Sequence, residues 1–479
     1  MKLSLKRTIL PVAIIALAYA PNFVFASDSW PNWRGPTQNG TVPGAKPPIE
    51  WSEDKNIKWK MEIPGSGLAT PIVWKDRIFL LSAIKQASTK PSSASAPKPA
   101  PVVERPRPGG EGVSPAGNGR RRPNRGGPGG RGGRGGPRGQ GGPGPQEEHA
   151  FHILALDRNS GEVIWSETAR KETPHEGHHP THGFASGSPV TDGQNLWVSF
   201  GSRGIFCYDL HGAVIWETDL GDLSTRNAFG EGASPVLAGD SLLVLWDQES
   251  QSYLVALDKK TGKELWRTER DEPTSWTTPV IVEVDGITQA IVAGSNKTRS
   301  YNTANGELIW EASGLTYNVI PTPVINDDFV YVVSGYKGRS VQAINLRSKG
   351  DVSDSASIAW SAPHSAPYVA SPVLSGNRLF MNKGNDAYLT CFNAQTGEVY
   401  FQDESLEGIR GIYASPISAN GHLYILGKEG VSLVIKDSEE FEIVSTNQLD
   451  APIDASPVIV GNELFIRTHT HLYCISNDS

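Results

Sequence analysis

The feature that most constrains the fold is a triplet, Ser or Thr, then Pro, then Val or Ile, that recurs along the chain. Its prolines are Pro71, Pro189, Pro235, Pro279, Pro323, Pro372, Pro416 and Pro457. Successive prolines lie 118, 46, 44, 44, 49, 44 and 41 residues apart, so only the first interval is aberrant. A period of roughly 40–50 residues built from short strands is typical of a β-propeller with one four-stranded sheet per repeat. The spacing therefore predicts an all-β, eight-bladed propeller of four-stranded blades.

Residues 256–266 show the local pattern within one repeat. Apolar positions alternate up to Leu257, a tight turn follows at 260–262, and a second strand ends at Trp266. This is the pattern of a β-hairpin. Aromatic residues close most repeats at the same place, namely Trp165, Trp216, Trp266, Trp310, Trp360 and Phe401. No repeat has the 3.6-residue periodicity of a helical solenoid, which excludes that class.

The two ends of the repeat region are predicted to meet in one blade. Only three strands follow Pro457, the last of them at Leu472–Ile475, so the final sheet lacks an outer strand. The segment Ile57–Glu62 alternates and ends as a repeat does. We expect it to close the last blade, which removes an open sheet edge. The propeller then spans residues 56–479.

The first residues read as an export signal. A basic start precedes an apolar run over residues 9–19, and small residues precede a cleavage site after Ala26. The run is too short to span a bilayer as a helix, and no cysteine near Ala26 offers a lipid anchor. Residues 1–26 are predicted to be a cleaved signal peptide. The mature chain is expected to be exported to the periplasm or the medium without a transmembrane anchor.

Residues 27–55 are too rich in Pro, Gly and Asn for regular structure, yet they contain Trp30, Trp33 and Trp51. We expect an arm that these tryptophans pin along the side of the ring.

Residues 86–148 account for the long first interval. They contain eleven Lys and Arg against four Glu, in a background of Pro, Ser and Gly. This composition cannot bury enough apolar surface to fold, so a disordered insertion within blade one is predicted, between its second and third strands. We expect this insertion to be a solvated loop without a dedicated partner. The alternative is that it contacts a polyanion or the acidic propeller itself. The whole chain has a formal net charge of −7, so the remainder is acidic, which argues against nucleic acid as a partner of the propeller.

In a propeller, the loops between blades and the loops joining second to third strands emerge on one face. Polar and aromatic residues on these loops predict a ligand-binding funnel there. The candidates are His182, Asn227, Glu231, Trp276, Asn318, Tyr368, Arg410, Tyr413 and Asp454. Trp276, Tyr368, Arg410 and Tyr413 are the expected main contacts to a peptide, a glycan or a small ligand. For any one residue, hydrogen bonding within a loop is the alternative, and no residue is assigned a catalytic role.

Four imidazoles, His175, His178, His179 and His182, lie within eight residues of one another. Imidazole is a ligand for zinc and copper, so this loop is a weak candidate metal site. It lacks the fixed spacing of a structural site, and no metal is predicted.

Residues 155–165 and 256–266 both resemble the Ala-x-Asp-x-x-Ser/Thr-Gly-x-x-x-Trp motif of the pyrroloquinoline-quinone-like (PQQ-like) propeller repeat family. Weaker copies occur at residues 208–216, 301–310 and 391–401. The resemblance implies that each tryptophan lies between two sheets and that its N–H caps a neighbouring backbone. The positions concerned are Trp59, Trp165, Trp216, Trp266, Trp310 and Trp360.

The resemblance leads to two functional branches. Quinoprotein alcohol and sugar dehydrogenases bind the quinone with Ca²⁺, and Glu231, Asn318 and Asp454 would be the nominated ligands here. This chain lacks the vicinal cysteine pair and the haem-binding segment found in many of those enzymes. The BamB-type branch is non-catalytic, and residues 30–36 resemble the arm of its exported relatives. We therefore favour a monomeric, cofactor-free scaffold or binding protein for a cell-envelope protein, a glycan or a small ligand. A PQQ-dependent dehydrogenase is the alternative.

Overall fold

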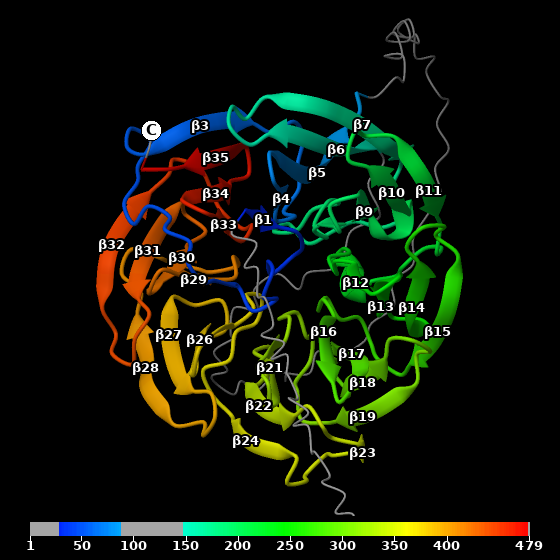
Figure 1. Cartoon of the computed structure of the whole chain (residues 1–479), viewed down its shortest axis with the longest axis vertical. Helices are drawn as coiled ribbons and strands as arrows, with labels where there is room; N and C mark the ends of the chain where they lie inside the picture. Colours follow the sequence, from blue (N-terminus) through cyan, green and yellow to red (C-terminus); the bar gives the residue numbers. More distant parts are fainter. Residues whose placement is uncertain (1–27, 88–146, 478–479) are drawn as a thin grey trace, which may run out of the picture.

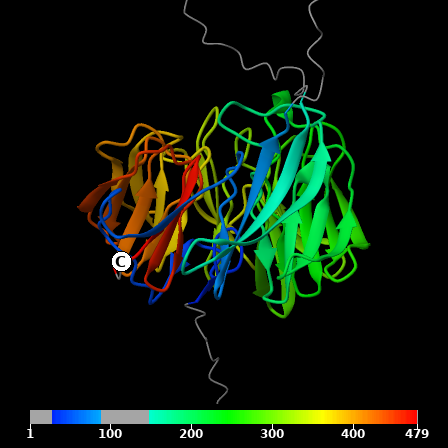
Figure 2. The ribbon, with the colours of Figure 1, turned by 90° about the horizontal axis from the view of Figure 1, so that it is seen from above.

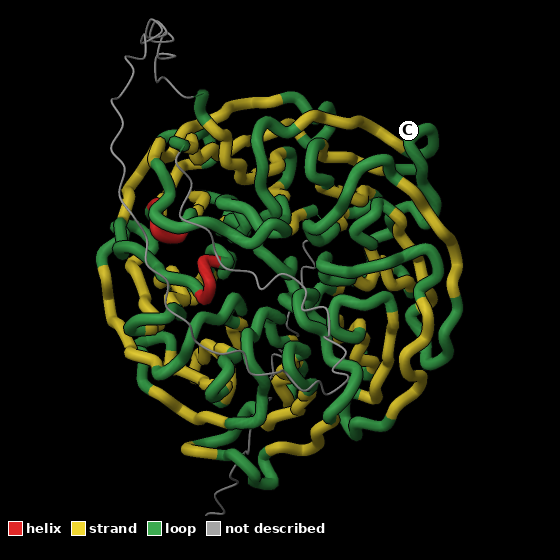
Figure 3. Tube along the Cα trace, turned by 180° about the vertical axis from the view of Figure 1, so that it is seen from behind, coloured by secondary structure: helices red, strands yellow, loops and turns green. Residues whose placement is uncertain are grey.

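The computed structural model describes residues 28–87 and 147–477, which form a ring of eight β-sheets around a central channel (Figure 1). Within those ranges the helices are two single turns, η1 (Gly201–Arg203) and η2 (Arg226–Ala228), drawn red in Figure 3. None of the helices described is long and apolar enough to cross a bilayer. The predicted all-β, eight-bladed fold is confirmed. The predicted signal peptide and residues 88–146 of the predicted insertion lie outside the described residues.

Every blade is an antiparallel sheet whose strands run in sequence from the channel outward, apart from the last. Blades 1 to 4 consist of β4 (Ile72–Trp74), β5 (Arg77–Lys85), β6 (His149–Asp157) and β7 (Val163–Glu172); β8 (Val190–Thr191), β9 (Asn195–Ser199), β10 (Ile205–Asp209) and β11 (Val214–Thr218); β12 (Val236–Ala238), β13 (Ser241–Trp246), β14 (Ser252–Asp258) and β15 (Glu264–Arg270); and β16 (Val280–Val284), β17 (Ile287–Val292), β18 (Thr298–Asn302) and β19 (Leu308–Ala312). Blades 5 to 8 consist of β20 (Val324–Ile325), β21 (Phe329–Ser334), β22 (Ser340–Asn345) and β24 (Ile358–Ala362); β25 (Val373–Ser375), β26 (Arg378–Asn382), β27 (Tyr388–Asn393) and β28 (Val399–Ser405); β29 (Ile417–Ala419), β30 (His422–Leu426), β31 (Val431–Lys436) and β32 (Ile443–Gln448); and β33 (Val458–Val460), β34 (Glu463–Arg467), β35 (His471–Ile475) and β3 (Ile57–Glu62).

The hydrophobic core is divided among the joints between blades. Trp197 of blade 2 packs with Leu242 and Val255 of blade 3 in one such cluster, and all three are fully buried. The second and third strands of a blade are apolar on both faces because each face meets a neighbouring blade.

Blade 8 is closed by the N-terminal strand, as predicted. β3 pairs antiparallel with β35, and Trp59 lies opposite Cys474. The Trp59 indole N–H then donates to the Arg158 carbonyl of blade 1 at 2.9 Å. The first and last repeats are therefore joined both by a strand ladder and by a capped tryptophan.

The same tryptophan contact recurs at four other joints. Trp165, Trp216, Trp266 and Trp360 donate to backbone carbonyls of the following blade over 2.8–3.0 Å. Gly161 shows the close approach that the contact requires. Its φ is +75°, and a Cβ there would lie 2.7 Å from the Trp59 ring.

Trp310 departs from this pattern. It is fully buried, and its indole N–H has no partner among the described residues. The next blade replaces the usual tight turn with residues 346–357, which include β23 (Gly350–Asp351). β23 adds in parallel to the outer edge of β19, with Gly350 beside Trp310. This segment explains the 49-residue interval between Pro323 and Pro372.

The N-terminal arm lies along the side of the ring only in its later part, so the prediction was wrong for its first residues. Its first part crosses one end of the central channel (Figure 2). There β1 (Ser29–Trp30) pairs with β4, and β2 (Thr41–Val42) pairs in parallel with β29. The innermost strands of a propeller have a free ladder edge, and the arm satisfies part of it. From Lys46 onward the arm runs outward to β3, and the backbone N–H of Trp51 donates to the side-chain oxygen of Asn447 in blade 7.

Residues 88–146 are inserted between β5 and β6, the second and third strands of blade 1. The two ends of this connection are held together, since the Gln86 N–H donates to the Glu148 carbonyl at 2.8 Å. β5 and β6 extend to the face of the ring opposite the arm, which we call the top face (Figure 2).

Candidate functional site

A cavity of about 390 Å³ occupies the centre of the ring, and residues from all eight blades line it. Trp33 of the arm is among them. The Trp33 indole N–H donates to the Thr322 hydroxyl at 2.9 Å, which fixes the arm as the floor. The channel is therefore closed from below. The volume is within the usual range of small-molecule pockets.

The lowest layer of the wall is formed by the Ser or Thr of each repeated triplet. We call these residues the hydroxyl ring; they are Thr70, Ser188, Ser234, Thr278, Thr322, Ser371, Ser415 and Ser456. All eight are at least 95 % buried, and all but Ser188 line the cavity. From Ser188 round to Thr70, each backbone N–H donates to the hydroxyl oxygen of the next member over 2.8–3.4 Å. Neighbouring blades are thus bonded directly at the channel.

The hydroxyl ring is interrupted at one joint, between blades 1 and 2. No bond from the Thr70 N–H to Ser188 is present, and the Ser188 hydroxyl is buried without a partner among the described residues. The N–H groups of Leu68 and Ala69 donate instead to the Ala185 carbonyl at 3.0 and 3.1 Å. This joint is held by backbone bonds rather than by the repeated hydroxyl.

A second layer lies two residues earlier in each repeat. In extended chain, residues i and i+2 face the same side, so these side chains also point to the channel. We call this layer the second ring; it consists of Leu68, Ser186, Gly232, Trp276, Ile320, Val369, Tyr413 and Asp454, all of which line the cavity. The first ring is chemically uniform, whereas the second ring has a different residue in every blade.

Loops of the top face complete the wall with aromatic and imidazole groups. Tyr336 and Tyr368 stack with ring centroids 4.9 Å apart. Phe229 and His179 meet edge to face at 5.2 Å. His182 is the member nearest the second ring, because its Nδ1 lies 3.2 Å from the Ser186 hydroxyl. Burial lowers the pKa of His182 to about 4, so this imidazole is neutral at pH 7.

Asp454 is the one acidic side chain in the described lining, and both of its oxygens are occupied. Lys428 Nζ lies 2.8 Å from Oδ1, and His469 Nε2 lies 2.8 Å from Oδ2. Burial alone would raise the pKa of Asp454, but the bonds from His469 and Lys428 hold it below its usual value. Lys428 also lies 3.4 Å above the centre of the Tyr413 ring, so that these residues act as one packed unit.

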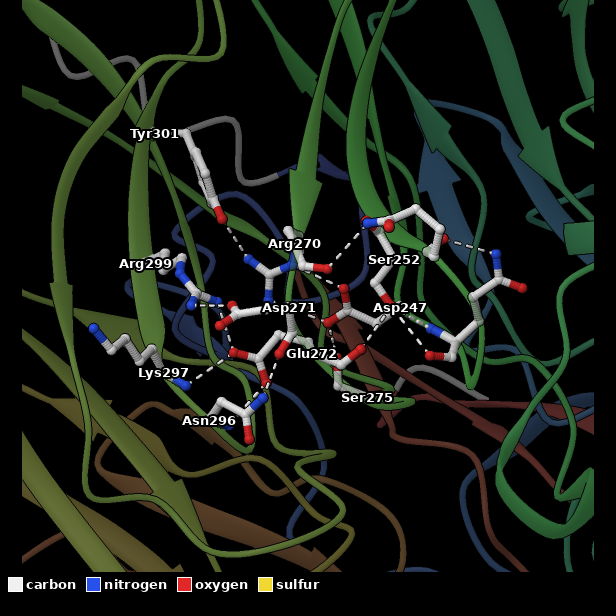
Figure 4. A network of polar contacts seen from close by, with 12 residues as sticks. Asp247, Ser252, Arg270, Asp271, Glu272, Ser275, Asn296, Lys297, Arg299 and Tyr301 are labelled. Atoms are coloured by element: carbon white, nitrogen blue, oxygen red, sulfur yellow. Dashed lines mark hydrogen bonds and ion pairs between the residues drawn. The ribbon is translucent and has the colours of Figure 1, made fainter.

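A buried polar network between blades 3 and 4 (Figure 4) includes Ser275, the residue directly before Trp276 in the chain. Asp247 accepts hydrogen bonds from Arg270 Nε at 2.8 Å and from the hydroxyl of Ser275 at 2.6 Å. Glu272 accepts from Arg299 at 2.7 Å. Buried charges require such pairing. The network fixes the loop that delivers Trp276 to the cavity.

The structure brings together five of the nine predicted funnel residues. His182, Trp276, Tyr368, Tyr413 and Asp454 line the central cavity.

The other four lie elsewhere. Asn318 is buried behind the wall, and its Oδ1 has no hydrogen-bond partner among the described residues. Glu231 lies in a small hollow between blades 2 and 3, where it accepts bonds from Ser202 and Arg203. Asn227 and Arg410 are exposed to solvent outside the cavity.

The four imidazoles of the His-rich loop make separate contacts. His175 bonds to the Leu223 carbonyl, His178 packs edge to face on Phe184, and His179 bonds to Thr181. No group of three or more His, Cys, Asp or Glu side chains within residues 28–87 and 147–477 is arranged to hold a metal ion.

Sequence reasoning did not identify the two rings, although the signal was available. The triplets give the register of every inner strand, and the period of two then points to the residues before each proline and three before it. Only Trp276, Tyr413 and Asp454 of the second ring were among the candidates.

The residues present do not fit a quinone held by Ca²⁺. That ion takes six to eight oxygen ligands, usually with several carboxylates. Of the three nominated ligands only Asp454 lines the cavity, and its oxygens are already bonded to Lys428 and His469. Glu231 is bonded to Arg203 in a different hollow.

The family model of the outer membrane protein assembly factor BamB matches residues 149–403. This match covers more than half of the chain. The chain belongs to the BamB family. The outer membrane protein assembly factor BamB of Yersinia pestis is 23 % identical over 334 residues, which cover 66 % of this chain and 78 % of that protein.

Two solved structures are similar in fold. A europium-containing methanol dehydrogenase has a TM-score of 0.57 at 9 % identity, covering 94 % of this chain and 98 % of that one. Quinohemoprotein alcohol dehydrogenase from Comamonas testosteroni has a TM-score of 0.58 at 7 % identity, covering 94 % and 81 %. At these identities the likeness concerns the propeller alone.

Proposed function

We propose that this BamB-family chain is an exported, non-catalytic propeller that binds a component of the cell envelope through its top face and central cavity. The family supports this assignment, since its named member is an outer membrane protein assembly factor. The observation that carries the non-catalytic part is the state of Asp454. The one acid of the described lining is paired with Lys428 and His469, so it is poorly suited to act as a base or to hold a cation.

The cavity lining supports binding rather than chemistry. Aromatic faces from Trp276, Tyr336, Tyr368 and Tyr413 offer contact area with little loss of side-chain freedom. The arm closes the lower end, which leaves the top face as the route of entry. A partner that inserts a side chain, a peptide end or a small group would meet this surface first.

The experiment is capture of envelope proteins by the purified mature chain, with Tyr413→Ala compared against Arg410→Ala. Tyr413 lines the cavity, whereas Arg410 is exposed outside it, so the second variant is a matched control from the same loop. We expect capture to fall at least severalfold for Tyr413→Ala and to be unchanged for Arg410→Ala. Equal capture by both variants and the wild type would remove the cavity from the proposal.

The quinoprotein alternative is tested by titrating the same protein with PQQ and Ca²⁺. We expect neither a stoichiometric quinone absorbance nor a rise in melting temperature, because the nominated ligands do not converge. Stoichiometric binding together with a raised melting temperature would overturn the scaffold assignment.

A further inference from the structure

We propose that one arc of the hydroxyl ring, Ser371, Ser415, Ser456 and Thr70, binds the carboxylate end of a small molecule whose aromatic body lies between the walls above. This inference names a ligand class for the site of the proposed function and rests on that function. It is carried by unused hydrogen-bond donors and by two buried arginines that have no carboxylate partner within residues 28–87 and 147–477.

The first observation concerns the hydroxyl hydrogens. Each hydroxyl of the arc accepts a backbone N–H from the preceding blade, at 2.9 Å for Ser371 and Ser415 and at 2.8 and 3.2 Å for Ser456 and Thr70. A hydroxyl also has one O–H to donate. None of these four O–H groups has an acceptor within the described residues, and all four side chains line the cavity. The arc therefore presents four unused donors to the cavity, which suits a group that only accepts, and two buried arginines distinguish it from the other hydroxyls of the ring.

The second observation is a pair of unpaired cations at the two ends of the arc. Arg34 of the arm is 98 % buried and donates to the carbonyls of Pro372 and Pro416, each next in sequence to a member of the arc. Arg467 is equally buried and donates to the carbonyls of Ala69 and Leu81, the first of which precedes Thr70.

Neither guanidinium has a carboxylate within salt-bridge distance among the residues described, and the Nε of each has no hydrogen-bond partner there. Burial lowers the pKa of both to about 9, which still leaves them charged at pH 7. A buried cation without a counter-ion is strongly disfavoured. Neither arginine lines the cavity, so an anion bound at the arc would offset their charge through space rather than by direct contact. The two guanidinium groups bind backbone carbonyls beside the arc and do not contact the ligand directly. Their positive potential at the arc is therefore moderate, which suits a singly charged carboxylate better than a phosphate dianion.

The rest of the cavity sets the body of the ligand. Tyr413 and the stacked pair Tyr336 and Tyr368 stand above the arc, and Trp276 of blade 4 lines the same cavity on another side. These faces favour a flat aromatic group. Asp454 also faces the cavity, but Lys428 and His469 pair with its oxygens, so it does not cancel the positive potential of the arc.

The test is calorimetric titration of the purified mature chain with 3-phenylpropionate, with 3-phenylpropanamide as the neutral probe of the same shape. We expect the carboxylate to bind about tenfold more tightly, the difference typical of hydrogen bonds to a charged acceptor. Equal affinity for the two probes, or no binding of either, would overturn the proposal.

A matched pair of variants locates the site. Ser415→Ala and Ser234→Ala each remove one acceptor of the hydroxyl ring, so they perturb the fold similarly, but only Ser415 belongs to the arc. Ser415→Ala should weaken binding of 3-phenylpropionate severalfold, and Ser234→Ala should leave it within twofold. Equal losses would assign the effect to the fold and overturn the arc.

The outcome is separable from that of envelope capture. A chain that captures partners but discriminates neither probe refutes only the carboxylate site. A chain that selects the carboxylate but captures nothing refutes only the proposed envelope role.

Discussion

Two layers of the same cavity wall, only two residues apart along each inner strand, differ completely in chemistry. The hydroxyl ring has Ser or Thr in every blade, and the same type of hydrogen bond, from a backbone N–H to a hydroxyl oxygen, is present at seven of its joints. The second ring holds eight different residue types, from Gly232 to Trp276, and these make no common contact. In the hydroxyl ring, the residue type and its hydrogen bond repeat together from blade to blade, which assembly of the propeller explains. In the second ring, the residue type varies from blade to blade, so it is free to be selected for binding.

The comparison predicts that substituting a bonded member of the hydroxyl ring lowers stability, and within the proposed arc also weakens carboxylate binding. Substitutions in the second ring should change recognition more than stability. The control for the hydroxyl ring is Ser188, the member that accepts no hydrogen bond, and the control for the second ring is Gly183, a glycine that does not line the cavity.

The largest expected effect comes from removing two neighbouring acceptors of the hydroxyl ring. In the double variant Ser371→Ala/Ser415→Ala, the backbone N–H groups of Thr322 and Ser371 lose their partners in a buried site. An unsatisfied buried N–H costs about 1–3 kcal/mol, so the free energy of unfolding should fall by about 4 kcal/mol. Denaturant titration measures the change.

Ser188→Ala is the matched control within the same layer. The Ser188 hydroxyl is equally buried but has no partner among the described residues, so its removal breaks no bond. We expect its free energy of unfolding to stay within about 0.5 kcal/mol of the wild type, since losing an unsatisfied polar group is nearly neutral. A loss at Ser188 as large as that at Ser371 would contradict the hydrogen-bond account.

A smaller effect is expected from the imidazole next to the second ring. The pKa of His182 is lowered from 6.5 to about 4 by burial, so the unfolded chain binds the proton more readily over that interval. This contribution to stability is fully present above pH 6.5 and is lost as the pH falls towards 4. Because the His182 imidazole faces a cavity that admits water, we expect the free energy of unfolding to fall by about 2 kcal/mol, which is less than the full pKa shift would give.

The measurement is the free energy of unfolding at pH 7 and at pH 4.5 for the wild type and for His182→Gln. The variant should lose less stability than the wild type between the two values. His179 also has a lowered pKa, so the dependence should be reduced rather than abolished. An unchanged difference would show that His182 is not the titrating group.

The sequence predicted the ring because its evidence is local and repeated. The triplets, turns and closing tryptophans each fix a strand, and the missing fourth strand after Pro457 required the complement at Ile57–Glu62. The arm was misplaced because its contacts are made with residues far away in sequence. Trp33 meets Thr322, and Arg34 meets Pro372 and Pro416. No periodicity reports such pairings.

The candidate site was predicted only in part for a similar reason. Loop position placed residues on the top face, but depth depends on the register of the inner strand. Arg410 and Tyr413 are three residues apart, yet only Tyr413 lies three before a proline and so reaches the cavity. At Trp310 the motif predicted a contact that is not made. The segment containing β23 replaces the turn that would accept the hydrogen bond from the indole N–H.

The clearest separation of the two layers, with a change in stability smaller than that expected from His182, is expected at Gly232 of the second ring. Its backbone does not have the positive φ that would favour glycine, and an added Cβ would lie 3.1 Å from His182 Nε2 and 3.5 Å from Trp276. Gly232→Ala therefore needs a shift of a few tenths of an ångström in side chains that border open space. Such a change costs less than about 1 kcal/mol. The added methyl group nevertheless narrows the cavity between His182 and Trp276, so binding of 3-phenylpropionate should weaken severalfold. Gly183→Ala is the control, because its Cβ would have nothing closer than 3.8 Å and the residue does not line the cavity. If Gly232→Ala instead unfolded the ring and left recognition intact, the second ring would be structural and the distinction between the two layers would fail.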